Sequence, residues 1–500
     1  MAWMNTYTSN LDKPMLICEY AHAMGNAIGN LKEYWDVIES SNSTVGACIW
    51  DWVDQAIYDP QEIKQGVYRL HTGYDYPGPH QGNFCSNGII PATREESAKL
   101  MEVRAAHQFI KFHLDKIKGN KAEVTIVNRY DFRSLRGLDL KVSSVVNGKE
   151  TETKVIPLED IQPGDSATYY VPVAQAPVGS EVMLNLVVSY HAKQTFANAG
   201  HPVAQAQFEI AKRAPLAPYK AKAKGKSANF KVTTVGDTLS ITNDKVMAEV
   251  DKITGIITKL SIDSIDVIAD SLGFQYDNHR WIENDRYTDT ISGMQDTATV
   301  SFRKVGKNIE LTTDRKGEKC DTKIVYTFYP DGTVDMNVDF VPHTDKLRRA
   351  GLSAGINPAL NFVNYYAYGP FENYNDRKDG AMVGRYTTTV AEMPERYVKP
   401  QSTGGREGLR ELILLDAEGR GISIETEGNV SFSILPYTDA DLMNASHFWE
   451  MTPRPYNVLH LDAWTRGVGN ASCGADVDTL PKYRVPNEPM SYKLRISPVK

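Results

Sequence analysis

The sequence predicts a predominantly β, multidomain protein that begins with a short parallel strand-helix-strand segment and continues through two antiparallel β-sandwiches. Three observations support this fold class. Two apolar runs, residues 15–18 and 45–50, flank a stretch with helical spacing. Short strand patterns with hairpin signals begin near residue 124 and continue to the C-terminus. At 500 residues the chain exceeds a single typical core and has room for about three domains.

The first element is the apolar run 15–18, which ends on the carboxylate Glu19. A continuous apolar run bounded by polar and turn residues is typical of a strand buried on both faces. The apolar positions of residues 26–39 then recur at helical spacing, at Ile28, Leu31, Trp35 and Ile38. This pattern predicts a helix that leads into the second strand.

Glu19 and Trp50 stand at the ends of the two predicted strands. Parallel strands joined by a helix end at the same edge of the sheet, and this edge carries the ligand site in α/β folds. A carboxylate beside an indole suits sugar chemistry, because the acid can attack or protonate while the ring stacks on a pyranose. Taken alone, Glu19 fits equally an ordinary strand end, and Trp50 fits core packing.

The rest of the chain has β-type patterns. A helical pattern at Ala98, Met101, Ala105 and Phe109 precedes strand patterns at residues 124–127, 138–142 and 182–188, with an Asn147-Gly148 hairpin signal. These indicate an antiparallel sandwich that ends near Ala211. Residues 212–226, rich in Lys, Ala and Pro, predict a linker. Residues 334–340 alternate strictly after Asp331-Gly332 and indicate a hairpin with one buried face.

The composition excludes several functional classes. Hydrophobic residues make up 41% and charged residues 23%, as in ordinary globular proteins. The net charge of −7 and the lack of a basic stripe argue against nucleic acid as a partner. No apolar run approaches the roughly 18 residues of a membrane span, and residues 1–10 lack the apolar core of a signal peptide. Five widely spaced cysteines argue against a disulfide framework, so we expect a cytoplasmic location.

Four strings carry a family resemblance: PMLICEYAHAMGN at 14–26, WDWVDQ at 50–55, FCSNG at 84–88 and YGPFENYNDR at 368–377. Together, and in this order, they resemble the long β-galactosidases of glycoside hydrolase family 2. The resemblance implies a C-terminal remnant of a (β/α)8 TIM barrel at 1–105 and an immunoglobulin-like β-sandwich at 106–211. It further implies a galactose-mutarotase-like antiparallel β-supersandwich at 228–500, and the linker composition then assigns 212–227 to the connection between the two sandwiches.

The resemblance also implies roles for five residues. Glu19 matches the nucleophile of retaining β-galactosidases, which forms a covalent galactosyl ester. His22 matches a histidine that bonds sugar hydroxyls, and Trp50 matches the indole that floors the galactose pocket. Phe84 and Asn87 match positions that line the pocket near the sugar 6-hydroxyl. They would hold a monovalent cation, Na⁺ or K⁺, through a backbone carbonyl and a side-chain amide oxygen. The implied substrate is a β-galactoside such as lactose.

Important parts of the family pattern are absent from the sequence. The family's acid/base glutamate follows a Gly-Asn pair, and none of the pairs beginning at Gly25, Gly29, Gly82, Gly119, Gly428 and Gly469 is followed by Glu. The family's magnesium ligands also lie upstream of any segment matched here. We therefore expect the chain alone to be inactive and to need an N-terminal half or another chain, and we expect a homo-oligomer.

Two further departures concern the substrate pocket. Residues 72–80 replace a more acidic family loop, and Cys473 stands where some members place a tryptophan that stacks on substrate. One alternative interpretation is a non-catalytic carbohydrate-binding or assembly module that complements another chain. Another is a glucuronidase-like member of the same family, which the string at 368–377 and the large terminal domain disfavour.

Overall fold

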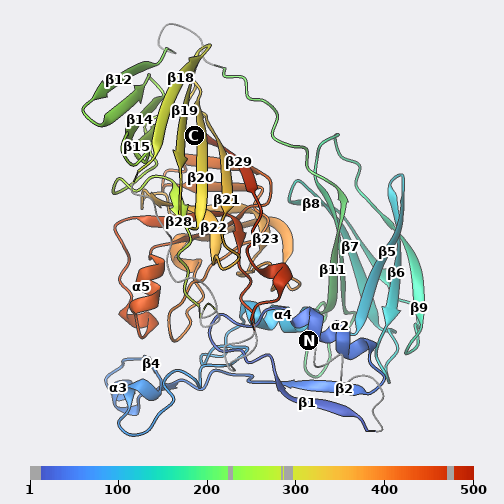
Figure 1. Cartoon of the computed structure of the whole chain (residues 1–500). Coiled ribbons are helices and arrows are strands. Elements are labelled where there is room, and N and C mark those ends of the chain that lie inside the picture. Colours follow the sequence, from blue (N-terminus) through green and yellow to red (C-terminus); the bar gives the residue numbers. More distant parts are fainter. Residues whose placement is uncertain (1–12, 223–228, 283–284, 286–296, 470–477, 500) are drawn as a thin grey trace. The chain divides into compact units, whose positions relative to one another are not determined.

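The computed structural model describes residues 13–222, 229–282, 285, 297–469 and 478–499. They form two compact units. One contains the described parts of Met1–Leu100, Pro218–Lys378 and Tyr386–Lys500, and the other contains Met101–Ala217 and Asp379–Arg385. Strands predominate over helices in both (Figure 1), which confirms the predicted mostly-β fold class. Within the described residues, no helix is long and apolar enough to cross a membrane.

The N-terminal segment has the predicted strand-helix-strand order, with β1 (Met15–Tyr20), α2 (Leu31–Ser40) and β2 (Thr44–Ile49). The two strands are parallel, and Cys18 lies opposite Cys48. The prediction that β1 is buried on both faces is wrong, because Leu16 is 56% exposed and Cys18 is also exposed. The two strands form a sheet of their own among the described strands, and no other described layer covers the face that carries Leu16 and Cys18.

Helix α2 begins at Leu31, several residues later than the helical spacing predicts. The backbone N–H groups of Gly29 and Asn30 instead donate to the carbonyl oxygens of Gly469 (2.6 Å) and Asp376 (2.7 Å). These long-range bonds use groups that would otherwise enter the helix. The buried face of the helix consists of Leu31, Tyr34 and Ile38, which follow the expected periodicity.

Short elements complete the segment: β3 (Ile57–Tyr58), α3 (Pro60–Lys64), β4 (Leu70–His71), η1 (Gly73–Asp75) and α4 (Ala98–Ala106). Helix α4 confirms the helical pattern at its first three positions. Phe109, the fourth, lies beyond the helix end, where its ring stacks on Tyr130 with centroids 4.9 Å apart. Phe109 is therefore apolar because it packs against Tyr130, and not because helix α4 continues to that position.

The smaller unit contains a seven-stranded sandwich of the immunoglobulin-like type. Its strands are β5 (Ile110–Lys118), β6 (Lys121–Asn128), β7 (Leu138–Val146), β8 (Lys149–Pro157), β9 (Ser166–Pro172), β10 (Val182–Tyr190) and β11 (Pro202–Ala211). The sheet orders are β5-β6-β9 and β11-β10-β7-β8. The predicted hairpin is confirmed, since Val146 pairs with Lys149 and both Asn147 and Gly148 have positive φ. Residues such as Ile126, Leu140 and Leu186 fill the core.

The large antiparallel sandwich is built from three sheets. The five-stranded sheet contains β12 (Lys231–Val235), β13 (Thr238–Thr242), β14 (Val246–Asp251), β15 (Ile257–Ile262) and β16 (Ile265–Asp266). The four-stranded sheet has the order β17 (Gln275–Asp277), β22 (Arg349–Ile356), β28 (Asn457–Thr465), β27 (Ser431–Leu435). The nine-stranded sheet has the order β18 (Thr299–Val305), β19 (Asn308–Arg315), β20 (Cys320–Phe328), β21 (Val334–Pro342), β29 (Met490–Val499), β26 (Gly421–Glu427), β25 (Glu411–Leu415), β23 (Phe362–Gly369), β24 (Met382–Thr389).

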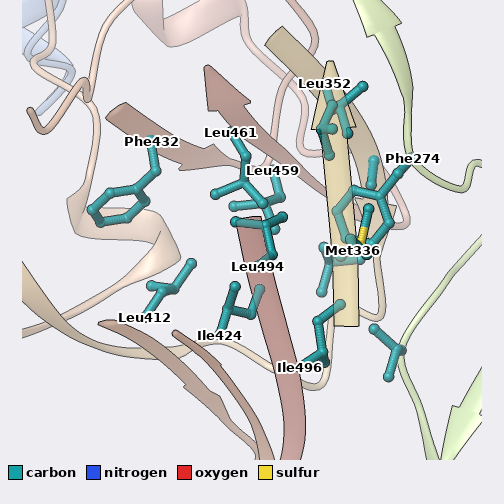
Figure 2. Close-up of a cluster of buried hydrophobic side chains, with 14 of the residues drawn as sticks. Phe274, Met336, Leu352, Leu412, Ile424, Phe432, Leu459, Leu461, Leu494 and Ile496 are labelled. Atoms are coloured by element: carbon teal, nitrogen blue, oxygen red, sulfur yellow. The ribbon is translucent and has the colours of Figure 1, made fainter. Parts of the chain in front are cut away.

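The core of this sandwich lies where the four-stranded and nine-stranded sheets face each other. Figure 2 shows Leu352, Leu459 and Leu461 of the first sheet packed near Leu494 and Ile496 of the second. Strand β21 alternates buried and more exposed positions after its hairpin, which confirms the predicted single buried face. The short helical elements outside the sheets of this sandwich, among the described residues, are η4 (Val390–Glu392), α5 (Asp439–Asn444), η5 (Phe448–Glu450) and η6 (Pro481–Tyr483).

The segment from 212 to 222 has no regular secondary structure. It is nevertheless anchored, because the Tyr219 hydroxyl donates to Asp331 Oδ2 (2.9 Å) and the Arg495 guanidinium lies 4.7 Å from the Tyr219 ring. The composition of residues 212–226 therefore predicted the lack of helix and strand in this segment. It could not predict the contacts of Tyr219 with Asp331 and Arg495.

Glu407 is a buried carboxyl group of the large sandwich, and it lines a pocket of about 350 Å³. Burial raises its pKa to about 7, against the opposing effect of Lys378. The folded state therefore holds a proton that the unfolded state releases, so stability should fall as pH rises from about 4.5 to about 7. Glu407→Gln should raise the free energy of unfolding by about 3 kcal/mol at pH 8 and change it little at pH 4.5.

Denaturant unfolding at the two pH values measures this effect. Glu152→Gln is a matched control, because Glu152 is exposed on β8. Equal effects of Glu407→Gln at both pH values would show that Glu407 is not held protonated by the fold.

Candidate active site

Glu19 and Trp50 lie at the same end of the β1-β2 pair, as the parallel topology predicts. Glu19 is exposed near the end of β1, and Trp50 follows β2 directly with 43% of its surface exposed. The backbone N–H of Trp50 donates to the backbone carbonyl of Tyr20 (3.1 Å), which fixes the two strand ends beside each other. A carboxylate and an accessible indole are thus presented from one edge of the sheet.

The loops that carry the other predicted residues join this edge. The Trp50 carbonyl accepts from Ala23 N (2.9 Å), immediately after His22. The Asp51 N–H donates to the Asn87 carbonyl (2.7 Å). The structure therefore brings the three strings at 14–26, 50–55 and 84–88 together through backbone hydrogen bonds.

His22 is half-buried and lies between Phe84 and Asn87. Its ring centroid is 5.1 Å from that of Phe84, and its Nε2 lies 3.4 Å from Asn87 Nδ2. Burial lowers the pKa of His22, and the Lys99 cation lowers it further. The imidazole is therefore neutral near pH 7, with one nitrogen able to donate and the other able to accept a hydrogen bond.

Phe84 and Asn87 offer the oxygen atoms that a hard monovalent cation requires. Asn87 is 3% exposed, and its Nδ2 donates to the Phe84 carbonyl (3.0 Å). Its Oδ1 is buried and has no hydrogen-bond partner in the described structure. An orphaned buried acceptor is unusual, and amide and carbonyl oxygens suit Na⁺ or K⁺. The chemistry of these two residues therefore fits the cation that the resemblance implies.

Two clusters of potential metal ligands occur among the described residues, and neither lies at this edge. In the described ranges, the clusters of three or more His, Cys, Asp and Glu side chains close enough to share an ion are His71-Asp75-His447 and Asp277-Asp439-His460. Neither includes Glu19 or His22, so no magnesium is assigned here. Cys473 lies outside the described residues.

The string at 368–377 has a structural function that sequence reasoning missed. Arg377 is 1% exposed, and its guanidinium donates to Ala27 O (3.1 Å) and Asn26 Oδ1 (2.7 Å) while pairing with Glu372. Asn26 in turn donates through Nδ2 to the Tyr374 hydroxyl (2.9 Å). We call Asn26, Ala27, Glu372, Tyr374 and Arg377 the loop clamp. It fixes the loop that follows Glu19 and His22 to the large sandwich.

A second contact group holds the start of α2. Asp376 accepts from the N–H groups of Val468 (2.9 Å) and Gly469 (2.8 Å). A Cβ atom on Gly29 would lie 2.0 Å from Asp376 Oδ2, so only glycine permits this approach.

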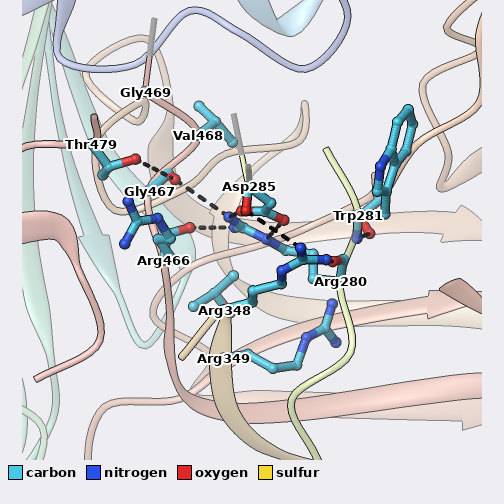
Figure 3. A network of polar contacts seen from close by, with 12 residues as sticks. Arg280, Trp281, Asp285, Arg348, Arg349, Arg466, Gly467, Val468, Gly469 and Thr479 are labelled. Carbon is cyan, nitrogen blue, oxygen red and sulfur yellow. Dashed lines mark hydrogen bonds and ion pairs between the residues drawn. The ribbon is translucent and has the colours of Figure 1, made fainter. Parts of the chain in front are cut away.

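Buried arginines lie next to the segment that contains Val468 and Gly469 (Figure 3). Arg280 is ion-paired with Asp285 and donates to the Arg466 carbonyl, and Arg348 donates to the Arg280 carbonyl. Each guanidinium thus satisfies backbone oxygens that would otherwise be buried without partners.

Lys99 is another functional residue that the sequence did not distinguish. It lies in the first turn of α4 and is almost fully buried, with Nζ donating to Ala23 O (2.8 Å) and Gly25 O (3.2 Å). Burial lowers its pKa. The lysine both fixes the backbone beside His22 and places a positive charge near that ring.

Known protein families match the chain along most of its length. The family model described as "Beta galactosidase small chain" matches residues 242–496. The models described as "Glycosyl hydrolases family 2, TIM barrel domain" and "Beta-galactosidase, domain 4" match residues 1–112 and 124–211. These matches confirm the resemblance carried by the four strings.

Individual proteins that are similar to this chain are beta-galactosidases. The beta-galactosidase of Priestia megaterium is 28% identical over 480 residues, which cover 92% of this chain and 45% of that protein. The beta-galactosidase of Vibrio cholerae serotype O1 is 28% identical over 502 residues, covering 93% and 46%. The chain thus spans about half the length of these relatives.

A solved galactose 1-epimerase from Lactobacillus acidophilus aligns with 54% of this chain and 98% of its own, with 10% identity and a TM-score of 0.31. A score of this size supports no conclusion about fold or function.

Proposed function

Because the chain belongs to the beta galactosidase small chain family and resembles family 2 glycoside hydrolases in its other parts, we propose that it supplies the nucleophile of a retaining β-galactosidase. The observation that carries this proposal is the edge at which Glu19, Trp50, His22 and Asn87 come together. The choice of galactose as the sugar rests on the similarity to the beta-galactosidases of Priestia megaterium and Vibrio cholerae.

In the proposed reaction the Glu19 carboxylate attacks the anomeric carbon of a bound β-galactoside. The bond to the leaving-group oxygen breaks as a second carboxyl group donates its proton to that oxygen. Water then attacks the galactosyl ester, gives a proton back to that second group and releases galactose with retention. Retaining enzymes hold the two carboxyl groups roughly 5 to 5.5 Å apart. The second carboxyl group would come from an N-terminal half or another chain.

The other site residues hold the sugar. Trp50 offers an exposed indole for stacking on the pyranose, and the neutral His22 ring can hydrogen-bond a hydroxyl in either direction. The Phe84 carbonyl and Asn87 Oδ1 would hold Na⁺ or K⁺, which when bound supplies positive charge for a sugar hydroxyl. The loop clamp holds Asn26 and Ala27 in the loop that follows His22, and a fixed loop favours efficient positioning.

The activity of the chain alone tests this function. We expect negligible hydrolysis of a nitrophenyl β-galactoside by the purified chain, and turnover after addition of the N-terminal half of the Priestia megaterium enzyme. General acid catalysis alone is worth about 10² to 10⁴-fold, and lost positioning adds to the deficit. Rapid turnover by the purified chain would contradict the need for a partner.

A second candidate is a non-catalytic assembly or carbohydrate-binding module. Exposed apolar side chains on the β1-β2 pair, Leu16 and Val45, favour association with another chain. Galactoside binding by the reassembled protein without turnover, and with no loss on Glu19→Gln, would favour this alternative.

A further inference from the structure

Two histidines and an aspartate from distant parts of the chain converge outside the Glu19 edge. His71 ends β4, Asp75 ends η1, and His447 directly precedes η5. One ligand atom from each lies within 4.8 Å of the others. The His71, Asp75 and His447 side chains are 13%, 18% and 6% exposed. His447 is thus buried, His71 is half-buried, and Asp75 is the member of the group nearest to solvent.

The inner ring nitrogens both point at one carboxylate oxygen. His447 Nε2 lies 2.8 Å from Asp75 Oδ2, and His71 Nδ1 lies 3.5 Å from the same atom. Thr72 N donates to this oxygen at 2.7 Å and fixes its direction. Ligand atoms around a tetrahedral Zn²⁺, at about 2.0 to 2.1 Å from the ion, lie about 3.4 Å apart. The His71 separation is close to this value, whereas His447 Nε2 and Asp75 Oδ2 are at hydrogen-bond distance and would move apart around an ion.

The outer ring nitrogens are each held by a further carboxylate. His71 Nε2 lies 2.8 Å from Glu62 Oε2, and His447 Nδ1 lies 2.7 Å from Glu450 Oε1. Metal-binding histidines commonly donate their second ring N–H to a carboxylate, which fixes the tautomer and leaves the other nitrogen free to coordinate. The outer nitrogen of each histidine has such a carboxylate partner, whereas the inner Nε2 of His447 is hydrogen-bonded to Asp75 in this structure, so a bound ion would replace that hydrogen bond.

The local charge suits a dication. Three carboxylates, Glu62, Asp75 and Glu450, surround two imidazoles, and Arg69 contributes one positive charge 3.7 Å from Glu62. With neutral imidazoles the group has an excess of two negative charges. A divalent ion balances this excess, since imidazole and carboxylate together suit Zn²⁺ and related transition metals.

We propose that His71, Asp75 and His447 bind one divalent transition metal ion of the Zn²⁺ class, with water completing its coordination. Glu62 and Glu450 orient the two histidines. Because His71 and Asp75 belong to the segment before α4 and His447 to the large sandwich, the ion joins two parts of the chain that are far apart in sequence. Its role is distinct from the sugar chemistry proposed for Glu19.

Titration of the metal-free 500-residue chain with Co²⁺ tests the site directly. We expect one equivalent to give the visible absorption of tetrahedral Co²⁺, and Zn²⁺ to displace it. His71→Gln and His447→Gln should each weaken binding at least about 100-fold. His113→Gln is the matched control, because His113 is exposed on β5, and it should leave binding unchanged.

Trp449 provides a local reporter. Its ring stacks on His447 with centroids 4.7 Å apart and lies 6.0 Å from His71. Co²⁺ should quench tryptophan fluorescence, and Trp449→Phe should keep the stoichiometric absorption while losing most of the quenching. Quenching unchanged in Trp449→Phe would place the ion elsewhere.

A conservative variant guards against loss of folding in the ligand variants. Glu450→Gln keeps the side-chain volume and should weaken Co²⁺ binding about 10 to 100-fold. The site is disproved if the folded chain binds no stoichiometric Co²⁺, or if binding is insensitive to all three substitutions.

Discussion

Glu19→Gln is expected to abolish turnover in the enzyme reassembled from this chain and an N-terminal half. Glutamine is nearly isosteric with glutamate, so the fold should persist, but the amide is a far poorer nucleophile. Loss of a nucleophile commonly costs at least about 10⁴-fold in rate. Steady-state hydrolysis of a nitrophenyl galactoside measures the loss, and circular dichroism verifies the fold.

Covalent labelling identifies the nucleophile more directly. A 2-deoxy-2-fluoro galactosyl donor with a good leaving group should label Glu19. The fluorine slows both formation and hydrolysis of the galactosyl ester, whereas the good leaving group speeds only its formation. The ester therefore accumulates. Peptide mass spectrometry locates the label. Trp50→Phe should retain labelling with reduced sugar affinity, since phenylalanine keeps part of the stacking surface. A label on a different carboxylate would contradict the assignment of Glu19.

Local patterns predicted much of the fold because their causes are local. The alternation in β21 follows from the period of a strand, and Asn147-Gly148 supplies the positive φ values that a tight hairpin requires. The neighbouring positions of Glu19 and Trp50 follow from one topological rule for parallel strands joined by a helix. None of these inferences needed knowledge of contacts between distant segments.

Features that depend on distant partners could not be predicted in this way. The exposure of Leu16 depends on which layer packs over the face of β1, and the late start of α2 depends on bonds to Asp376 and Gly469. Buried Lys99 and Arg377 have no local signal, because their partners are segments far away in the sequence. The convergence of His71 and His447 has the same cause.

The distant contacts share one consequence for the candidate site. Glu19 lies on the two-stranded sheet β1-β2, on which Leu16 and Val45 are exposed. A sheet of two strands is only marginally stable by itself, so it cannot hold the loop after Glu19 rigidly. The loop clamp and Lys99 supply bonds to the backbone between residues 23 and 27. The large sandwich therefore acts as a support for the loop that follows Glu19, the proposed nucleophile.

Arg377→Met tests this support. It removes the guanidinium and leaves Glu372 as a buried charge without its arginine partner. The Ala27 carbonyl loses its Arg377 donor, and Asn26 Oδ1 keeps only the Tyr397 hydroxyl. Breaking one side of a buried ion pair typically costs about 3 to 5 kcal/mol. We expect fast amide hydrogen exchange across residues 21–30, and a large loss of turnover in the reassembled enzyme because Glu19 is no longer positioned.

The matched control is Arg420→Met, which removes an exposed arginine paired with Asp416 and should change neither measurement. Combining Arg377→Met with Glu372→Gln should cost less than the sum of the two single substitutions, since the stranded charge is then removed as well. If the double variant were strictly additive, or if exchange across 21–30 stayed slow in Arg377→Met, the loop would be held by other contacts and the sandwich would not be the support for Glu19.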